Sequence, residues 1–288
     1  MSGPLVEATG LTKDFGEIRA VDDVTLDVHA GEVVGLLGAN GAGKTTAIRM
    51  LLGLLAPTSG RAHLLGAPAS RASRGRLGYV PQSLGLYQEL TVAENLAFSA
   101  HAYGSRPAEL TGGLVDVADR QLGGVPLGLQ RQLAFRCALQ HAPDVLVLDE
   151  PTSGVDPLAR ARLWDTVREQ ADRGVAVLVT THYMQEARQC DRLLLMSRGA
   201  VVGRGSEADI VGDTAVVRVE TPDWRQAFAA LHEAGLPVTL AGTAVRVVGV
   251  DARRVDHVLA EAGVAGEARP APATIDERMV LLATPTTP

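Results

Sequence analysis

The sequence predicts an α/β protein with a largely parallel sheet, followed by a small α+β domain. Apolar runs short enough to be strands alternate with helical segments as far as about residue 210, and this alternation is typical of parallel sheets. After residue 213 the expected order becomes strand, helix, two strands and helix. We therefore expect two domains, residues 1–212 and residues 213–288.

The elements of the first domain follow from apolar spacing and from turn residues. Strands are expected at residues 5–9, 24–28 and 33–37, and then a helix in TAIRMLLGLL that stops at Ala56-Pro57. Short strands are expected in RAHLLG and RLGYVP, and a helical subdomain at about residues 86–134. Beyond it, DVLVLDE and VAVLVTTH predict strands, DPLARARLWDTVREQADRG and YMQEARQCD predict helices, and RLLLMSRGAVVGRG predicts a hairpin.

The second domain shows its own start signals. Thr221 and Pro222 predict a helix that reaches Gly235, with the threonine as its cap and the proline in its first turn. PVTLAGTAVRVVGV predicts two strands, and DARRVDHVLAEAG predicts a helix. Thr274 and Glu277 have the spacing of a capping box, so we expect a last helix to begin there.

Charge and composition narrow the function. The 288 residues carry a net charge of −6, which disfavours a nucleic-acid-binding surface, so no nucleic-acid partner is expected. The initial MSGPLVEATG lacks the basic and apolar regions of a signal peptide, and no apolar run reaches the roughly 18 residues of a membrane span. We therefore expect a cytoplasmic chain that serves a membrane only through another protein.

The segment GANGAGKT fits the phosphate-binding pattern G-x-x-x-x-G-K-[ST] and lies between an expected strand and an expected helix, as that motif requires. Backbone N–H groups of such a loop surround a phosphate, and the helix N-terminus favours its charge. Lys44 would contact the β- and γ-phosphates of a nucleotide, and the Thr45 hydroxyl would bind Mg²⁺; the loop alone does not choose among kinases, GTPases and ATPases. The alternative is a glycine-rich turn without a ligand. The expected nucleotide-binding residues of the loop are Gly38, Ala39, Asn40, Gly41, Ala42, Gly43, Lys44, Thr45 and Thr46.

Polar side chains at the ends of three apolar strands are candidates for attack of water on a nucleotide phosphate. In VLVLDE, Asp149 is placed to bind Mg²⁺, and Glu150 is placed to act as the base for an attacking water. Gln82 would meet both Mg²⁺ and this water, and His182 would hydrogen-bond the γ-phosphate. The alternatives are two acids that only end a strand, a surface glutamine and a structural histidine. The expected catalytic set is thus Glu150, His182, Gln82 and Lys44, and the expected metal ligands are Thr45, Gln82 and Asp149.

Taken in order, GANGAGKTT, GYVPQ, QRQLAFRCALQHAPDVLVLDEP, SGVDP and TTHYMQEA resemble the motifs of the ATP-binding-cassette (ABC) family over roughly residues 5–210. The resemblance implies a P-loop ATPase core with an antiparallel β subdomain, and a head-to-tail dimer in which the signature segment of one subunit closes on the ATP of the other. It also implies that Gly128 and Asp156 contact nucleotide and that Phe15 stacks on adenine, the alternative being a core aromatic. The C-terminal part resembles a domain of bacterial drug-export ATPases.

Two features depart from the family pattern. The family's LSGG clamp falls on residues 125–128, which read VPLG, so only Gly128 matches; this form resembles a minority group of bacterial exporters with an LPLG clamp. Pro126 removes one N–H and the serine hydroxyl, yet proline is tolerated at the first position of a helix. We therefore expect a weakened but working clamp, with the Leu127 side chain turned away from nucleotide. The helical subdomain is also shorter than usual.

The resemblance predicts the ATP-binding and ATP-hydrolysing subunit of a bacterial ABC exporter. Such a subunit dimerises on binding ATP and powers a separate membrane permease from the inner face of the cell membrane. Two alternatives stay open: a soluble ABC protein of DNA repair or translation, and a regulatory nucleotide-binding module with weak or no hydrolysis. The altered clamp favours the second of these, and ATPase measurements discriminate among all three.

Overall fold

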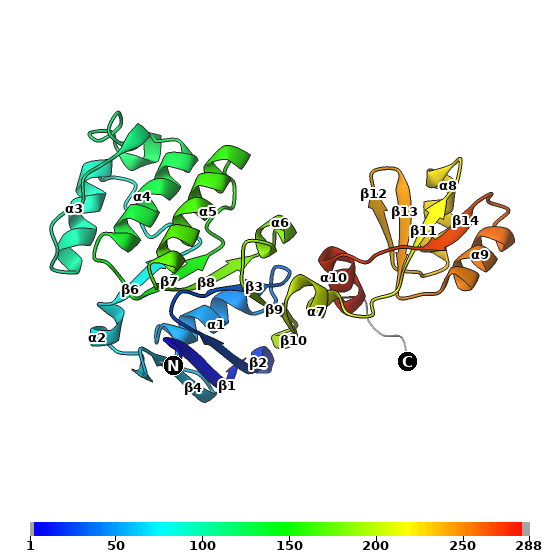
Figure 1. Ribbon diagram of the computed structural model, residues 1–288, viewed down its shortest axis with the longest axis horizontal. Helices are drawn as coiled ribbons and strands as arrows, with labels where there is room; N and C mark the ends of the chain where they lie inside the picture. Colours follow the sequence, from blue (N-terminus) through cyan, green and yellow to red (C-terminus); the bar gives the residue numbers. More distant parts are fainter. Residues whose placement is uncertain (1–2, 284–288) are drawn as a thin grey trace. The chain divides into compact units, whose positions relative to one another are not determined.

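The computed structural model describes residues 3–283, which form two compact units, one that ends at Arg204 and one that begins at Gly205 (Figure 1). This division lies N-terminal to the expected boundary between residues 212 and 213. The difference comes from helix α7 (Glu207–Val211), which packs against the last helix, α10 (Ile275–Ala283), and therefore belongs to the second unit.

A six-stranded sheet forms the centre of the first unit, with the strand order β10-β9-β3-β8-β7-β6. Neighbouring strands from β9 to β6 run parallel, which confirms the prediction from the alternation of strands and helices. The strands are β3 (Val33–Leu37), β6 (Leu77–Val80), β7 (Val145–Asp149), β8 (Ala176–Thr181), β9 (Arg192–Ser197) and β10 (Ala200–Gly205).

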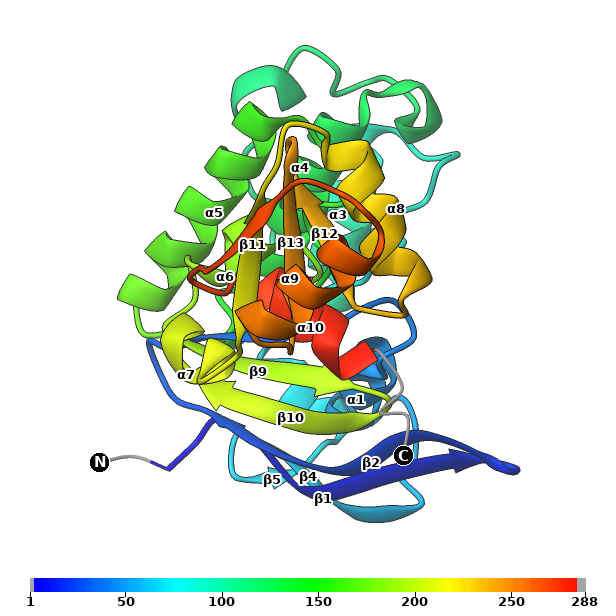
Figure 2. The ribbon, with the colours of Figure 1, turned by 90° about the vertical axis from the view of Figure 1, so that its right-hand side faces the viewer.

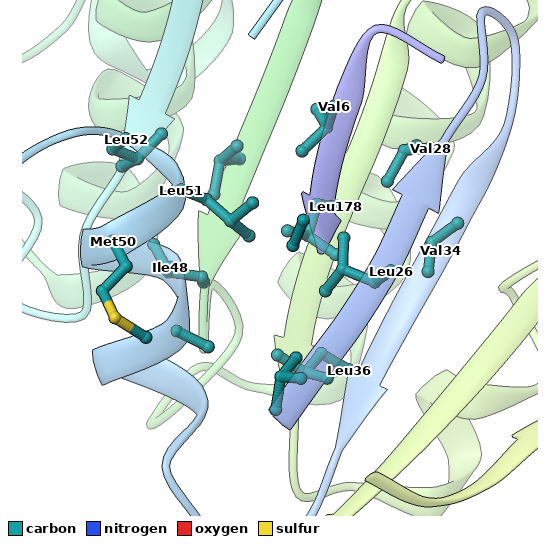
Figure 3. Packing of buried hydrophobic residues seen from close by; sticks show 14 of the residues in the cluster. Val6, Leu26, Val28, Val34, Leu36, Ile48, Met50, Leu51, Leu52 and Leu178 are labelled. Carbon is teal, nitrogen blue, oxygen red and sulfur yellow. The ribbon is translucent and has the colours of Figure 1, made fainter. Parts of the chain in front are cut away.

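A second, antiparallel sheet has the order β2-β1-β4-β5, and helix α1 (Lys44–Leu51) packs between the two sheets. Figure 3 shows Ile48 and Leu51 on the side of this helix that faces the labelled side chains of β1, β2 and β8. The helix ends before the expected Ala56, because Gly53 adopts a left-handed φ of 65°. The strands are β1 (Val6–Phe15), β2 (Ile18–Val28), β4 (Ser59–Leu64) and β5 (Ala67–Pro68).

Helices α4 and α5 cover the other face of the six-stranded sheet, where their apolar side chains form one buried cluster with β6, β7 and β8. The helical subdomain is built from α3, α4 and two single 3₁₀ turns, η1 and η2, that lie between them. No helix in the described range 3–283 is long and apolar enough to cross a membrane. The helices are α2 (Arg71–Arg74), α3 (Val92–Ala102), η1 (Gly112–Leu114), η2 (Leu122–Gly124), α4 (Leu127–Leu139), α5 (Pro157–Asp172) and α6 (Met184–Ala187).

The second unit contains a four-stranded antiparallel sheet with the order β12-β13-β11-β14 (Figure 2). Apolar residues of β11, β13 and β14 alternate inward and form a core with helices α8 and α9. The elements are β11 (Val216–Glu220), α8 (Trp224–Glu233), β12 (Val238–Ala241), β13 (Ala244–Val248), α9 (Ala252–Glu261), β14 (Glu267–Pro270) and then α10.

The two predicted helix starts of this unit have different outcomes. The prediction of a Thr221 cap is wrong: Asp223 caps α8, because its carboxylate accepts hydrogen bonds from the Arg225 and Gln226 N–H groups. The prediction of a capping box at α10 is confirmed, since Thr274 and Glu277 exchange hydrogen bonds between side chain and backbone.

Candidate active site

A cavity of about 300 Å³ opens at the N-terminus of α1, within the first unit. Loop residues 40–46 line it, and so do Ala20, Gln82 and Glu150. Gln82 follows β6 and Glu150 follows β7 directly, so the carboxyl ends of two neighbouring parallel strands bring these side chains to the phosphate loop, as expected.

The phosphate loop requires glycine for two different reasons. Gly43 has a φ of 99°, and a Cβ there would lie 2.5 Å from the Ala20 carbonyl oxygen, so no other residue fits. Gly41 has a φ of 81°, and a Cβ there would meet nothing within 4 Å, so the backbone beside it stays open to the cavity. No side chain caps α1, which leaves its first N–H groups available for an anion.

The Lys44 ammonium is buried beside the loop. Its Nζ donates to the carbonyl oxygens of Gly38 at 2.7 Å and Ala39 at 3.1 Å, and it lies 3.7 Å from Glu150 Oε1. Burial lowers the pKa of Lys44, although the charges of Glu150 and Asp149 oppose this shift. Gly38 and Ala39 thus contribute through their carbonyl groups, and these contacts are ones that phosphate oxygens can replace.

The Glu150 carboxylate joins the predicted catalytic residues. Gln82 Nε2 donates to Glu150 Oε2 at 3.1 Å, Ser153 Oγ donates to the same oxygen at 3.4 Å, and His182 Nδ1 lies 3.4 Å from it. Glu150 itself is 8% exposed and has a φ of 49°, a conformation that non-glycine residues rarely adopt and that occurs at functional sites. Four strand-end and loop segments therefore meet at one carboxylate.

The neighbouring Asp149 carboxylate fits a metal ion. Thr180 Oγ1 donates to Asp149 Oδ1 at 2.6 Å, whereas Oδ2 is buried and has no hydrogen-bond partner among residues 3–283. A buried carboxylate oxygen without a donor calls for a cation, and the carboxylate, hydroxyl and amide of Asp149, Thr45 and Gln82 are the oxygen ligands that Mg²⁺ prefers.

Thr180 contacts both acids of the candidate site, which we did not expect from the sequence. Besides its bond to Asp149, its Oγ1 accepts the Glu150 N–H at 2.9 Å, so one hydroxyl holds both acids in place. The available signal was the pair of threonines inside the apolar strand VAVLVTTH, because buried hydroxyls need partners.

Besides Gly38 and Ala39, which contact Lys44 through their carbonyl groups, the predicted nucleotide-binding residues Phe15, Gly128 and Asp156 lie outside the cavity. Phe15 ends β1 and is 50% exposed, which excludes the alternative of a core aromatic, and its ring lies 5.2 Å from Lys13 Nζ. Gly128 lies on α4. Asp156 caps α5, and hydrogen bonds from the backbone, that of Ala159 foremost, lower the pKa of its carboxyl. Nucleotide contacts of these three residues remain a prediction.

The clamp helix begins one residue later than predicted. Pro126 occupies the cap position of α4, with a ψ of 141°, and Leu127 is the first helical residue. No side chain caps this helix, so its first N–H groups point out of the helix without a side-chain acceptor, as the prediction of a working clamp requires.

Comparisons with known proteins agree with this geometry. The pattern of the ABC transporter family matches residues 21–153, which hold the phosphate loop, Gln82 and both acids. The probable multidrug ABC transporter ATP-binding protein YbhF of Escherichia coli (strain K12) is 43% identical over 240 residues, or 79% of this chain and 41% of YbhF. The Nod factor export ATP-binding protein I of Burkholderia lata is 40% identical over 237 residues, or 76% of this chain and 77% of that protein.

Solved structures show the same fold. The ATP-binding subunit of an ABC transporter superposes with a TM-score of 0.64 at 30% identity, over 72% of this chain and 91% of that one. A dimeric ATP-binding cassette with ADP and Pi gives a TM-score of 0.62 at 23% identity, which supports the fold alone. This chain spans about two fifths of the length of YbhF but most of the length of the Nod factor export protein. The chain belongs to the ABC transporter family.

Proposed function

We propose that this chain binds and hydrolyses ATP as the ATP-binding subunit of an ABC exporter and powers a separate membrane permease. The observation that carries this proposal is the Glu150 carboxylate, which lies beside a phosphate cradle and is held by Gln82 and close to Lys44 and His182. A regulatory module without hydrolysis has no need of a buried carboxylate on a residue with a rare backbone conformation at this position.

The residues around the phosphate loop have different roles in hydrolysis. Phosphate oxygens replace the contacts of Lys44 with Gly38, Ala39 and Glu150, and this exchange leaves Glu150 free to accept a proton from water. Gln82 and His182 hold that water and the γ-phosphate in line. Thr45, Gln82 and Asp149 would hold Mg²⁺, which neutralises charge on the β- and γ-phosphates when it is bound.

Dimerisation on ATP, as a homodimer or with a related cassette, completes the site in this proposal. The cavity is lined by the phosphate loop, Gln82 and Glu150 of this chain. Gly128 on α4 and Asp156 at the start of α5, which we also expect to contact nucleotide, lie outside it. A second chain placed head to tail supplies those residues to the open side of the cavity.

Two observations support the proposal of an exporter with a permease partner: the names of the relatives and an exposed pair of aromatic residues. YbhF and the Nod factor protein are named for multidrug transport and for export. Tyr87, in the segment that follows Gln82, is 49% exposed, and Phe98, on α3, is 52% exposed. Their rings pack edge to face with centroids 4.9 Å apart. Exposed aromatic pairs are typical of protein interfaces, so we propose that this one contacts the permease at the inner face of the cell membrane.

A phosphate-release assay tests the proposed function. The purified chain should release phosphate from ATP when Mg²⁺ is present, and its permease, reconstituted with it in vesicles, should raise that rate. The Glu150→Gln variant is the matched control for contaminating ATPases. ATP binding without phosphate release, alone and with permease, would make the chain a regulatory module.

A further inference from the structure

The first turn of α4 contacts the segment of residues 150–156 that follows β7. A Cβ built on Gly154, whose φ is 77°, would lie 3.0 Å from Leu127 Cδ2, so the leucine side chain lies directly over this glycine. Beside it, a Cβ on Gly128 would lie 3.7 Å from Ala159 Cβ and 3.9 Å from Asp156 Oδ2. The residues at the clamp position therefore pack against their own chain.

Arg131 makes a second contact with the same segment, one turn after Leu127. Its side chain is buried with 4% of its surface exposed, and Nη2 donates to the Ser153 carbonyl oxygen at 3.1 Å. Its Nε and Nη1 are also buried and have no hydrogen-bond partner in the described part of the chain. A buried guanidinium with two unpaired nitrogens costs free energy that a leucine or methionine would not, so packing alone does not account for it.

The other arginine of α4 shows that this orientation is specific. Arg136 is half-buried and bonds the carbonyl oxygen of Glu109, in the loop before η1, and so has no part in the contact with residues 150–156. Leu127 and Arg131 are spaced i, i+4 and share one helix face, and that face meets Ser153 and Gly154.

We propose that Leu127 and Arg131 latch the clamp helix to Ser153 and Gly154, so that α4 and the segment after Glu150 move as one body. The inference rests on the proposed dimer, in which α4 closes on the ATP of the partner while residues 150–156 begin at the chain's own base. Closure on one ATP thereby positions Glu150 at the other. Leu127 and Arg131 are positioning residues in this scheme. Leu127, which stands where the family pattern has glycine, serves to hold α4 against Gly154.

The test compares steady-state ATP hydrolysis, ATP affinity and thermal melting for the full-length chain and its variants. Arg131→Gln removes the charge, and Arg131→Lys keeps it. Leu127→Ala removes the side-chain contact with Gly154. Arg136→Gln is the matched control on the same helix. For Arg131→Gln we expect kcat to fall at least about five-fold and the Hill coefficient to approach that of independent sites, at wild-type ATP affinity. Leu127→Ala should act in the same direction, Arg131→Lys should restore part of both, and Arg136→Gln should match the wild type.

Each contrary result has a distinct meaning. Wild-type hydrolysis with a wild-type Hill coefficient in both Arg131→Gln and Leu127→Ala overturns the latch and leaves the proposed function standing. Loss of ATP affinity or of thermal stability in step with kcat also overturns it, because the arginine would then serve only the fold. A wild-type chain that hydrolyses ATP without cooperativity overturns the coupling itself. A wild-type chain with no hydrolysis, alone or with permease, overturns the proposed function as well.

Discussion

Each of the two units places a cation beside a buried glutamate, and the two pairs are built differently. In the first unit, Lys44 Nζ lies 3.7 Å from Glu150 Oε1 and donates its hydrogen bonds to carbonyl oxygens of the phosphate loop. In the second unit, Arg246 donates from Nε and Nη2 to the two carboxylate oxygens of Glu277, which also accepts the Thr274 N–H at 2.9 Å. We call Lys44 and Glu150 the loose pair, because their contacts can be exchanged for others. We call Arg246 and Glu277 the saturated pair, because both carboxylate oxygens already accept hydrogen bonds.

The difference separates a binding site from a structural link. Lys44 and Glu150 keep contacts that phosphate and water replace, and Asp149 Oδ2 beside them has no donor in the described residues. Buried polar groups left incompletely paired cost stability, and proteins tolerate that cost where function needs it. Arg246 and Glu277 leave no such opening, so they connect α10 to β13 and nothing more.

The largest effect is expected when the acid of the loose pair is neutralised. Glu150→Gln should slow hydrolysis by roughly 10²–10⁴-fold, because an amide cannot accept the proton of the attacking water. ATP binding should persist, and ATP-bound dimers should accumulate on size-exclusion chromatography. Turnover at the wild-type rate would place the base at another residue.

Breaking the saturated pair should cost stability and leave activity intact. Arg246→Met leaves Glu277 buried without its cation, which we expect to destabilise the second unit by about 3–5 kcal/mol. Urea unfolding followed by Trp224 fluorescence in a Trp164→Phe background reports this unit alone. Arg218→Met, at the cross-strand neighbour on β11, is the exposed control. Equal stability of the two variants would contradict the structural role of the pair.

Removing the cation of the loose pair should weaken nucleotide binding with little change in folding. Lys44→Ala removes a buried charge from the β- and γ-phosphates and should cost about 2–5 kcal/mol of ATP affinity. Calorimetric titration measures the loss, and Arg61→Ala, an exposed position on β4, changes the net charge equally. Unchanged affinity in Lys44→Ala would refute the assignment of the phosphate loop.

The smallest effect is expected at the clamp. Pro126→Ser restores a hydroxyl and an N–H at the start of α4, and a hydrogen bond to a charged group contributes about 1.5–3 kcal/mol at most. In the Glu150→Gln background, this change should tighten the ATP-bound dimer in analytical ultracentrifugation. A dimer of unchanged strength would mean that the proline form already makes its full set of contacts.

Features that depend on neighbouring residues were predictable from the sequence. The phosphate loop lies within eight positions, and the capping box at Thr274 spans one helical turn. The alternation of apolar runs predicted the parallel sheet, and a parallel sheet brings the acids at the carboxyl end of β7 and the glutamine after β6 to one edge. That much follows from local sequence and from one rule of topology.

Contacts between distant segments were decided only by the tertiary structure. The sequence does not show that Thr180 holds Asp149 and Glu150, that Asp223 outcompetes Thr221 as a cap, or that α7 joins the second unit. The orientation of Arg131 toward Ser153 belongs to the same class, since both arginines of α4 look equivalent in the sequence. The physical reason is that a side chain's partners depend on which helix faces and loops the packed core brings together, and a periodic pattern defines the face but not its neighbour.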